Sequence, residues 1–395
     1  MKSALAAALL AGLAAPARAA FKVPGYELVY SYPAETTLDE PDLRQAQDVW
    51  PEMIDAARRT LDVNEFYVTP STGEPLEPTL AAMDRAARRG VKIRVILEKG
   101  FEKNSLDGIA RLRTMPGLQL KLADWSALTG AGIVHAKYFV VDSTRAFVGS
   151  QNLDWRALKH THEMGLAVDD TPVVRQVQSV FDHDWAIAGS TSPAAPVGLK
   201  IPLADDSGRA YLVASPWRQN PDGVGDSQTE LVRLIGRAKR EIVVQNLEYF
   251  TRTRSQPPRY YWALDQALRD AAIRGVKLKI LVSHWGTEEP AVKGLQSLAV
   301  LPNVEARVIT IPEAKRGPIP FARVTHSKYA VFDGEVLWLG TSNWTGGYLD
   351  ESRNLELVIK DQALAARAAA VQKHLWDSPY SAPLEILKTY PKPRR

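Results

Sequence analysis

The stretch His135-Ala-Lys137-Tyr-Phe-Val-Val-Asp142, followed by Gly149-Ser150-Gln-Asn152, decides how the rest of the chain is interpreted. The same pattern returns as His326-Ser-Lys328-Tyr-Ala-Val-Phe-Asp333, followed by Gly340-Thr341-Ser-Asn343, and each of these positions lies 191 residues after its counterpart. The pairs His183 and His374, and Trp185 and Trp376, keep the same spacing, so the repeat extends beyond the motif. A fixed spacing of this kind predicts that the chain consists of two similar halves.

The apolar residues inside each motif predict short buried strands, because β-branched and aromatic runs favour that environment. Alternate side chains of a strand share one face, so His135 and Lys137 are expected to point the same way, as are His326 and Lys328. A second strand in each half, 146–149 or 336–340, is expected to end at the remaining polar residues of its motif, which are Ser150 and Asn152 in the first half and Thr341 and Asn343 in the second. Each half therefore offers an imidazole, an ammonium, a hydroxyl and an amide.

Two such sets facing each other would suit a phosphodiester. Lysine and asparagine side chains can donate to the non-bridging oxygens. One histidine can attack phosphorus and the other can protonate the leaving oxygen. The two lysines supply the positive charge, so this interpretation predicts no metal and no cofactor. The pair His160 and His162 could mimic a metal site, but the sequence offers no third ligand at a suitable spacing.

The two motifs, and the longer strings 149–156 and 340–348, resemble those of the phospholipase D superfamily, and look most like its lysosomal exonuclease branch and bacterial relatives. The resemblance implies an α/β fold of two tandem sandwich halves about a pseudo-two-fold, with the active site at the seam. It also implies cleavage through a phosphohistidine, with His135 as nucleophile and His326 as acid. The expected substrate is a phospholipid or single-stranded nucleic acid. The alternative is a non-catalytic binder of phosphate ligands that uses the same pocket.

The carboxylates of the pattern are harder to place. Asp142 and Asp333 belong to the motif and are grouped with the catalytic residues, although a structural or histidine-orienting role is expected for them. In the family, a carboxylate at the position of Glu163 often orients a catalytic histidine. Strict register places Asn354, and not Glu356, opposite Glu163.

Composition excludes few functions. The chain has 395 residues, 45% hydrophobic content and a net charge of +4, which neither requires nor excludes a nucleic-acid partner. It contains no cysteine, so disulfides and thiol chemistry are excluded. No obligatory protein partner is predicted; a peripheral membrane contact is possible, and a monomer would suffice because one chain carries both motifs.

The predicted organisation has five parts. Residues 1–19 have a basic start, an apolar run and an Ala-x-Ala cleavage site, which is typical of a signal peptide and predicts a periplasmic or secreted protein. Residues 20–188 and 201–380 are the two halves, and 189–200 is a linker rich in small residues and proline. Residues 381–395 form a basic tail that is expected to be solvated and disordered, with a phosphate or membrane-surface contact as the alternative.

Helix and strand patterns alternate within each half, which predicts an α/β sandwich. In the first half we expect a helix over 45–61 and strands over 65–68 and 91–97. The loop 251–262 mixes arginines with aromatic residues, which suits single-stranded nucleic acid or lipid headgroups; the alternative is an exposed hairpin that leads into a helix. His284-Trp285 and Lys315-Arg316 are candidates for the pocket rim.

Overall fold

The computed structural model describes residues 20–190, 192–253 and 257–395; the predicted signal peptide lies outside the described residues. These described residues form two large mixed sheets of nine strands each and a small two-stranded one. The first sheet has the order β1-β2-β11-β9-β8-β4-β6-β7, with β3 beside β2, and the second has the order β13-β12-β19-β18-β17-β14-β15-β16-β20. From β2 to β7 and from β12 to β16 the two orders correspond strand for strand, so the sequence repeat is a structural repeat.

The elements have the following bounds. The first half contains β1 (Lys22–Val23), β2 (Tyr26–Ser31), β3 (Arg44–Gln45), α1 (Ala46–Asp55), β4 (Thr60–Glu65), β5 (Val68–Thr69), α2 (Leu76–Arg88), β6 (Lys92–Glu98), α3 (Leu106–Arg113), β7 (Gln119–Ala123), α4 (Trp125–Thr129), β8 (Tyr138–Val141), β9 (Arg145–Gly149), β10 (Leu153–Asp154), β11 (Glu163–Val168) and α5 (Thr171–Ile187). The second half contains β12 (Ala210–Ser215), β13 (Gly225–Asp226), α6 (Ser227–Arg237), β14 (Glu241–Asn246), α7 (Trp262–Ile273), β15 (Lys277–Ser283), α8 (Ala291–Leu298), β16 (Val304–Ile309), β17 (Tyr329–Phe332), β18 (Val336–Gly340), β19 (Asn354–Lys360), α9 (Gln362–Asp377) and β20 (Ser381–Pro383).

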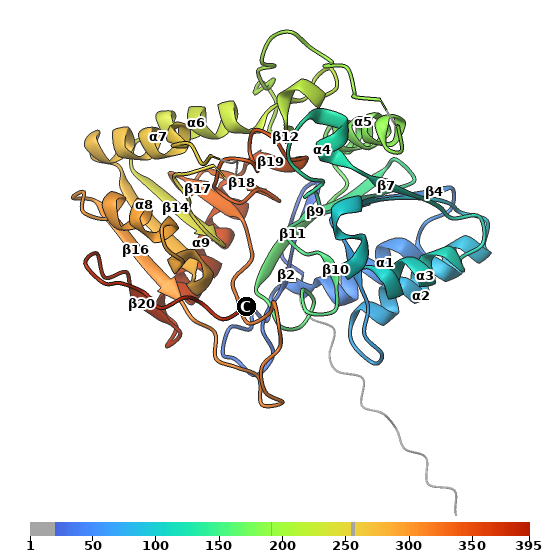
Figure 1. The fold of residues 1–395 in the computed structure, drawn as a ribbon, viewed down its shortest axis with the longest axis horizontal. Coiled ribbons are helices and arrows are strands. Elements are labelled where there is room, and N and C mark those ends of the chain that lie inside the picture. The colour runs from blue at the N-terminus through green and yellow to red at the C-terminus, as the bar shows by residue number, and fades with distance from the viewer. Residues whose placement is uncertain (1–19, 191, 254–256) are drawn as a thin grey trace, which may run out of the picture.

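Helices cover both faces of each large sheet. Helices α1, α2 and α3 pack on the outer face of the first sheet, and α6, α7 and α8 on the outer face of the second, at the two sides of the molecule (Figure 1). Helices α5 and α9 contribute to a third core, shared by both halves, that contains residues of β8, β9, β17 and β18. The motif strands are buried on both faces, and this explains why they are apolar throughout. The shared core fixes the two motifs relative to each other.

The ends of the inner helices follow from their sequence. Asp170 precedes α5, and its carboxylate accepts a hydrogen bond from Val173 N at 3.2 Å. Asp361 caps α9 in the same way through Leu364 N at 2.9 Å. An aspartate at this position satisfies a backbone N–H that the helix itself leaves unpaired.

Some expected elements differ from the structure. The helix expected over 45–61 ends at Asp55, because residues 60–65 form strand β4 and leave no room for a longer helix. The strand expected over 65–68 lies where β4 ends, so Phe66 and Tyr67 follow that strand and do not lie within it. Strand 91–97 is confirmed as β6, with a shift of one residue.

Most of the predicted tail, residues 381–395, is exposed as expected, but part of it is ordered. Strand β20, Ser381–Pro383, pairs antiparallel with β16 at the edge of the second sheet. Tyr390, further along, packs against the core of the second half. Among the described residues, no helix is both long and apolar enough to cross a membrane.

Candidate active site

The two motif histidines lie at the seam between the halves. His135 lies shortly before β8 and His326 shortly before β17, and the backbone of each histidine is hydrogen-bonded to the other half. His135 N donates to Arg353 O at 3.0 Å, and His326 N donates to His162 O at 2.7 Å. Each histidine is therefore positioned by the strand that begins in the opposite half, β19 or β11, and the site forms only when the halves are packed together.

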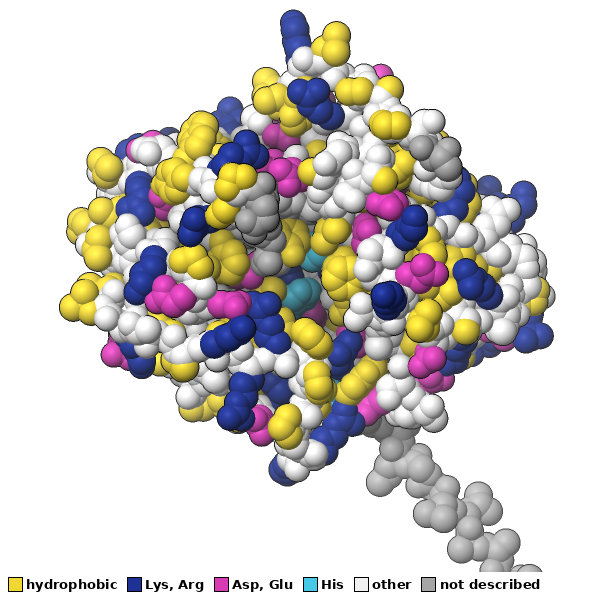
Figure 2. Space-filling view, in the orientation of Figure 1, with side chains coloured by type: hydrophobic (Ala, Val, Ile, Leu, Met, Phe, Trp, Pro, Cys, Tyr) yellow, Lys and Arg dark blue, Asp and Glu magenta, His cyan; other side chains and the backbone are white. Residues whose placement is uncertain are grey.

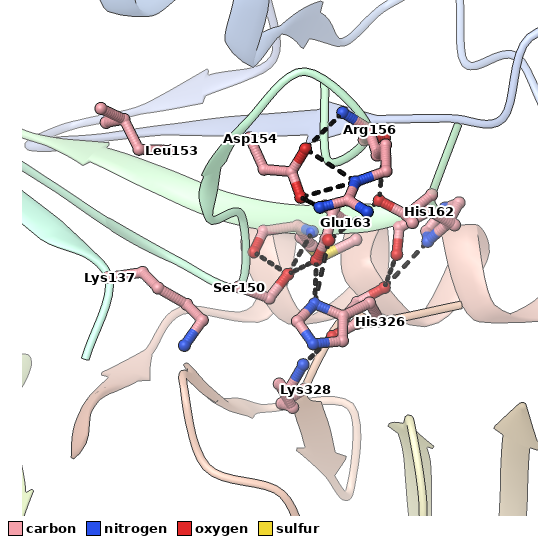
Figure 3. A network of polar contacts seen from close by, with 12 residues as sticks. Lys137, Ser150, Leu153, Asp154, Arg156, His162, Glu163, His326 and Lys328 are labelled. Carbon is pink, nitrogen blue, oxygen red and sulfur yellow. Dashed lines mark hydrogen bonds and ion pairs between the residues drawn. The ribbon is translucent and has the colours of Figure 1, made fainter. Parts of the chain in front are cut away.

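Each imidazole also contacts a side chain from the opposite half, but the two contacting side chains differ in charge. Oδ1 of Asn354, at the start of β19, lies 2.9 Å from Nδ1 of His135. Both carboxylate oxygens of Glu163, at the start of β11, lie 2.9 Å from Nδ1 of His326 (Figure 3). Because each Nδ1 is engaged, the Nε2 atom is the ring nitrogen left for chemistry. Glu163 and Asn354, which are 191 residues apart in the repeat, therefore occupy equivalent positions in the structure, each beside one histidine.

Ser150 and Thr341 hold these two partners. Ser150 Oγ donates to Glu163 Oε2 at 2.6 Å, and Thr341 Oγ1 donates to Asn354 Oδ1 at 2.8 Å. Both hydroxyl side chains are fully buried, and neither residue lines the pocket described below. The structure therefore gives Ser150 and Thr341 a supporting role, without direct contact to a phosphate.

Lys137 and Lys328 are buried beside the histidines. Each ammonium donates to the backbone carbonyl of its own motif histidine. Figure 3 shows the two side chains reaching towards the same centre from opposite halves. Burial lowers the pKa of Lys137 to about 7, and it lowers the pKa of Lys328 well below its usual range.

The same environment acts on the other titratable groups. Burial, with the two lysines as the next cause, lowers the pKa of both His135 and His326 well below the usual range. Burial raises the pKa of Glu163 to about 7. Perturbed groups of this kind, collected in one cavity, are typical of catalytic sites.

A cavity of about 520 Å³ contains both histidines, together with Asn152, Asn343 and Glu163. Figure 2 shows histidine side chains at the bottom of a hollow between the halves, with hydrophobic side chains beside them. Oδ1 of Asn152 and Oδ1 of Asn343 are buried and have no hydrogen-bond partner in the described part of the chain. Asn343 Nδ2 donates to Glu248 Oε1 at 3.4 Å. Both asparagines line the cavity that contains the histidines.

Aromatic side chains form much of the wall of this cavity. Phe66 and Tyr348 approach the ring of His135, with centroid distances of 5.2 and 4.6 Å. Phe66 also packs on Phe101, at 4.1 Å. Among the described residues, the aromatic lining apart from the histidines consists of Phe66, Tyr67, Phe101, Trp285, Phe321 and Tyr348. Such a wall suits the planar or apolar part of a ligand.

Asp154 and Arg156 form the polar part of the wall in the first half. Arg156 Nε lies 2.9 and 3.0 Å from the two Asp154 oxygens, and Arg156 also donates to Pro320 O at 3.1 Å (Figure 3). Tyr67 Oη donates to Asp154 Oδ2 at 2.9 Å. The Arg156 guanidinium therefore ties a loop of the second half to the first half and shapes the cavity.

Asp142 and Asp333 are not part of the site, which corrects their grouping with the catalytic residues. Each lies at the other end of its strand from the motif lysine. Asp142 accepts from the backbone N–H groups of Arg58, Arg59 and Thr60 at 2.7–2.9 Å. Asp333 does the same for Lys239, Arg240 and Glu241 at 2.7–3.0 Å. Both carboxylates close the turn that leads into β4 or β14, and this is a structural role.

The other candidates have separate positions. His162 is buried, with Nδ1 2.8 Å from Ser327 Oγ, and His160 packs against Trp155. The described residues of 251–262 do not line the cavity; Arg252 and Tyr260 pair in a hairpin that leads into α7. Arg316 pairs with Glu74 at 2.7 Å. Of the pair His284-Trp285, only the tryptophan lines the cavity.

Sequence reasoning missed most of the cavity wall. Phe66 and Tyr67 directly follow β4, the neighbour of motif strand β8, and this position was the available signal. Arg353 was also missed. It occupies the position equivalent to His162 in the repeat, it is fully buried, and its Nε lies 3.0 Å from Asp184 Oδ1.

A fold of two packed α/β halves, with paired histidines and lysines at the seam, defines a class of phosphodiester-cleaving enzymes. The family model for the cardiolipin synthase, phospholipase D-like domain matches residues 51–185 and again residues 231–376. The chain belongs to the phospholipase D superfamily.

Characterised relatives cover most of the chain. It is 30% identical over 368 residues to phospholipase D Z of Dictyostelium discoideum, which covers 85% of this chain and 86% of that protein. It is also 30% identical over 372 residues to human 5′-3′ exonuclease PLD3, which covers 85% of this chain and 75% of that protein. A solved phosphatidylserine synthase of Haemophilus influenzae has the same fold, with a TM-score of 0.60 at 12% identity over 86% of this chain and 85% of its own. The protein is a phosphodiester hydrolase of this superfamily.

Proposed function

We propose that the protein cleaves a phosphodiester through a covalent phosphohistidine, without a metal, and that single-stranded nucleic acid is its substrate. The observation that carries the mechanism is the crossed pair of contacts to the histidines, an amide at His135 and a carboxylate at His326. Positive charge for the phosphate comes from Lys137 and Lys328.

The difference between the two contacts assigns the roles. Asn354 Oδ1 can accept the Nδ1 proton of a neutral imidazole, so His135 keeps a free electron pair on Nε2 and acts as the nucleophile. Burial lowers the pKa of His326 in the free protein, and Glu163 is the group that can stabilise its imidazolium, so His326 is assigned to deliver the proton that the leaving oxygen needs. The role assignment expected from the family resemblance agrees with this difference.

The proposed cleavage has two steps. In the first step, Nε2 of His135 forms a bond to phosphorus while the bond to the leaving oxygen breaks, and that oxygen takes the Nε2 proton of His326. In the second, water attacks phosphorus, gives its proton to Nε2 of His326, and the phosphorus–nitrogen bond breaks. Asn152 and Asn343 line the cavity close to the reacting histidines and can donate to the non-bridging oxygens.

The aromatic wall supports nucleic acid as the substrate. Bases of any sequence stack on aromatic side chains, each contact contributing roughly 1–3 kcal/mol. The relative named as a 5′-3′ exonuclease supports the same choice. Phospholipid is the second candidate, because another relative is named as a phospholipase D and the side chain of Phe321 at the cavity is 57% exposed.

The proposal is tested with protein that starts at Ala20, in excess EDTA. A single-stranded oligonucleotide and phosphatidylcholine vesicles are offered in parallel, each with a His135→Ala control. Shortening of the oligonucleotide that is lost in the control is expected. Choline release would make the protein a phospholipase, and activity that requires an added divalent metal would contradict the mechanism.

We also propose that the chain is exported after cleavage behind Ala19 and acts in the periplasm or outside the cell. The basis is the basic start, apolar run and small-residue cleavage site of residues 1–19. N-terminal sequencing of protein recovered from the periplasm should begin at Ala20. A first residue of Met1, or retention in the cytoplasm, would contradict export.

A further inference from the structure

The segment after α9 is held against the second half by specific contacts. The buried side chain of Gln296, in α8, donates from Nε2 to Glu385 O at 2.9 Å and to Lys388 O at 2.8 Å. Tyr390 Oη accepts from Glu385 N at 2.9 Å, and its ring packs on the core. These contacts direct the segment from the edge strand β20 around α8.

The end of this segment reaches the active-site cavity. Trp285 Nε1 donates to Arg394 O at 3.1 Å, and the Arg395 guanidinium lies over the Trp285 ring, 5.5 Å from its centroid. Both Trp285 and Arg395 line the cavity that contains His135 and His326. Figure 1 shows the last residues turning inward from β20 to the boundary between the halves.

Among the described residues, Arg395 is the better placed of the two arginines that line the cavity. Arg156 is the other arginine of the lining, and Asp154 and Pro320 O already engage it. Arg395 pairs with Glu288, and their side chains are 38% and 30% exposed. Exposed ion pairs contribute little to stability, so a phosphate can displace the Glu288 carboxylate at little cost. A guanidinium stacked on an aromatic ring still presents its N–H edge to such a ligand.

We propose that Arg395, held by Trp285, forms a second phosphate subsite that binds the phosphate next to the scissile one in a nucleic-acid strand. The inference rests on the proposed function, because the scissile phosphate is placed at His135 and His326. The subsite selects substrates with two or more phosphates and takes no part in the chemical step.

The test compares thymidine dinucleotide, TpT, which has one phosphodiester, with the trinucleotide TpTpT, which has two. Wild-type protein is expected to have a lower KM for TpTpT. In Arg395→Ala this advantage should be lost, with KM for TpTpT raised about tenfold, the usual size of a charge-assisted contact, while both parameters for TpT stay unchanged. Lys392→Ala is the matched control, because it removes an exposed cation of the same segment that does not line the cavity.

Two results would overturn the subsite. One is an equal change in KM for TpT and TpTpT in Arg395→Ala, and the other is the same loss in Lys392→Ala. Calorimetric binding of TpTpT to His135→Ala protein, with and without Arg395→Ala, makes the test independent of turnover. Tight, Arg395-dependent binding without turnover in the wild type would support the subsite and reject the proposed reaction, so the two failures can be told apart.

Discussion

The carboxylate of Glu163 lies 2.9 Å from Nδ1 of His326, although the two residues belong to different halves of the repeat. At the equivalent position of the second half, Asn354 makes the corresponding contact to His135. The fold is repeated, but the charge at the two imidazoles is not. In the proposed mechanism, this single difference separates the histidine that delivers a proton from the one that offers an electron pair.

The role of Asn354 is tested by Asn354→Asp, which keeps the shape and adds a charge. A carboxylate at Nδ1 of His135 should favour the protonated imidazole and so withdraw the nucleophile. We expect the acidic limb of the kcat/KM profile to move to higher pH, with the loss of activity greatest at low pH. The substitution also replaces the amide that donates to Tyr348 O at 2.8 Å, so the pH profile is the decisive readout. An unmoved limb would contradict the assignment of His135 as nucleophile.

Glu163→Gln should act on the other histidine. Loss of the carboxylate removes the stabilisation of the His326 imidazolium, so kcat should fall by roughly 10²-fold or more. Steady-state kinetics on an oligonucleotide measures this directly, and a change in KM alone would argue for a role in binding instead.

The same substitution predicts a pH-dependent change in stability. Burial raises the pKa of Glu163 from 4.5 to about 7, so its protonated form stabilises the folded chain below pH 4.5, and this stabilisation is lost as the pH rises through 7. Glutamine stays neutral at every pH. Glu163→Gln should therefore gain stability relative to the wild type between pH 5 and pH 8, as followed by thermal unfolding. A difference in melting temperature between the variant and the wild type that stays constant over this pH range would show that the carboxyl of Glu163 does not titrate there.

Much of the fold follows from the sequence because the apolar runs of the motif strands, and the repeat itself, are local patterns. The histidines and lysines of the site follow as well, because their spacing is fixed. Most of the cavity wall does not, since Phe101, Phe321 and Arg395 come from three segments that only the packed fold brings together. The motif also could not predict that Asp142 lies away from the active site, because the length of the strand and the geometry of the turn decide where this residue lies.

Asp142→Asn should lower stability without changing the chemistry. Burial acts against the charged form, but three backbone N–H donors hold the pKa of Asp142 below its ordinary value. Its contribution is complete above the ordinary value of 3.8 and is lost as the pH falls through the lower folded value. We expect a lower melting temperature at pH 7, a smaller difference at pH 2–3, and unchanged kcat per folded molecule. A large loss of kcat would return this residue to the active site.

The buried ion pair of Arg353 and Asp184 should be important for the seam. Arg353 also donates to Ser215 O at 3.0 Å and to Gln219 O at 2.6 Å, and its own carbonyl accepts from His135 N. Arg353→Met leaves Asp184 buried without its partner, so the free energy of unfolding should drop by about 3–5 kcal/mol.

Arg237→Met is the matched control for this substitution, because the exposed pair of Arg237 with Asp206 should contribute less than about 1 kcal/mol. Urea unfolding of both variants measures the difference. Equal losses of unfolding free energy in the two variants would show that the buried ion pair stabilises the packing of the halves no more than an exposed pair does.

The most direct measurement is a search for the covalent intermediate in His326→Ala protein, with bis(p-nitrophenyl) phosphate as substrate. Its leaving group departs without a proton, so the first step should proceed, while the second lacks the base that activates water. Mass spectrometry is expected to find one p-nitrophenyl phosphoryl group on His135, with a burst of one p-nitrophenolate per protein. An adduct on another residue, or wild-type turnover with no adduct in the variant, would contradict the mechanism.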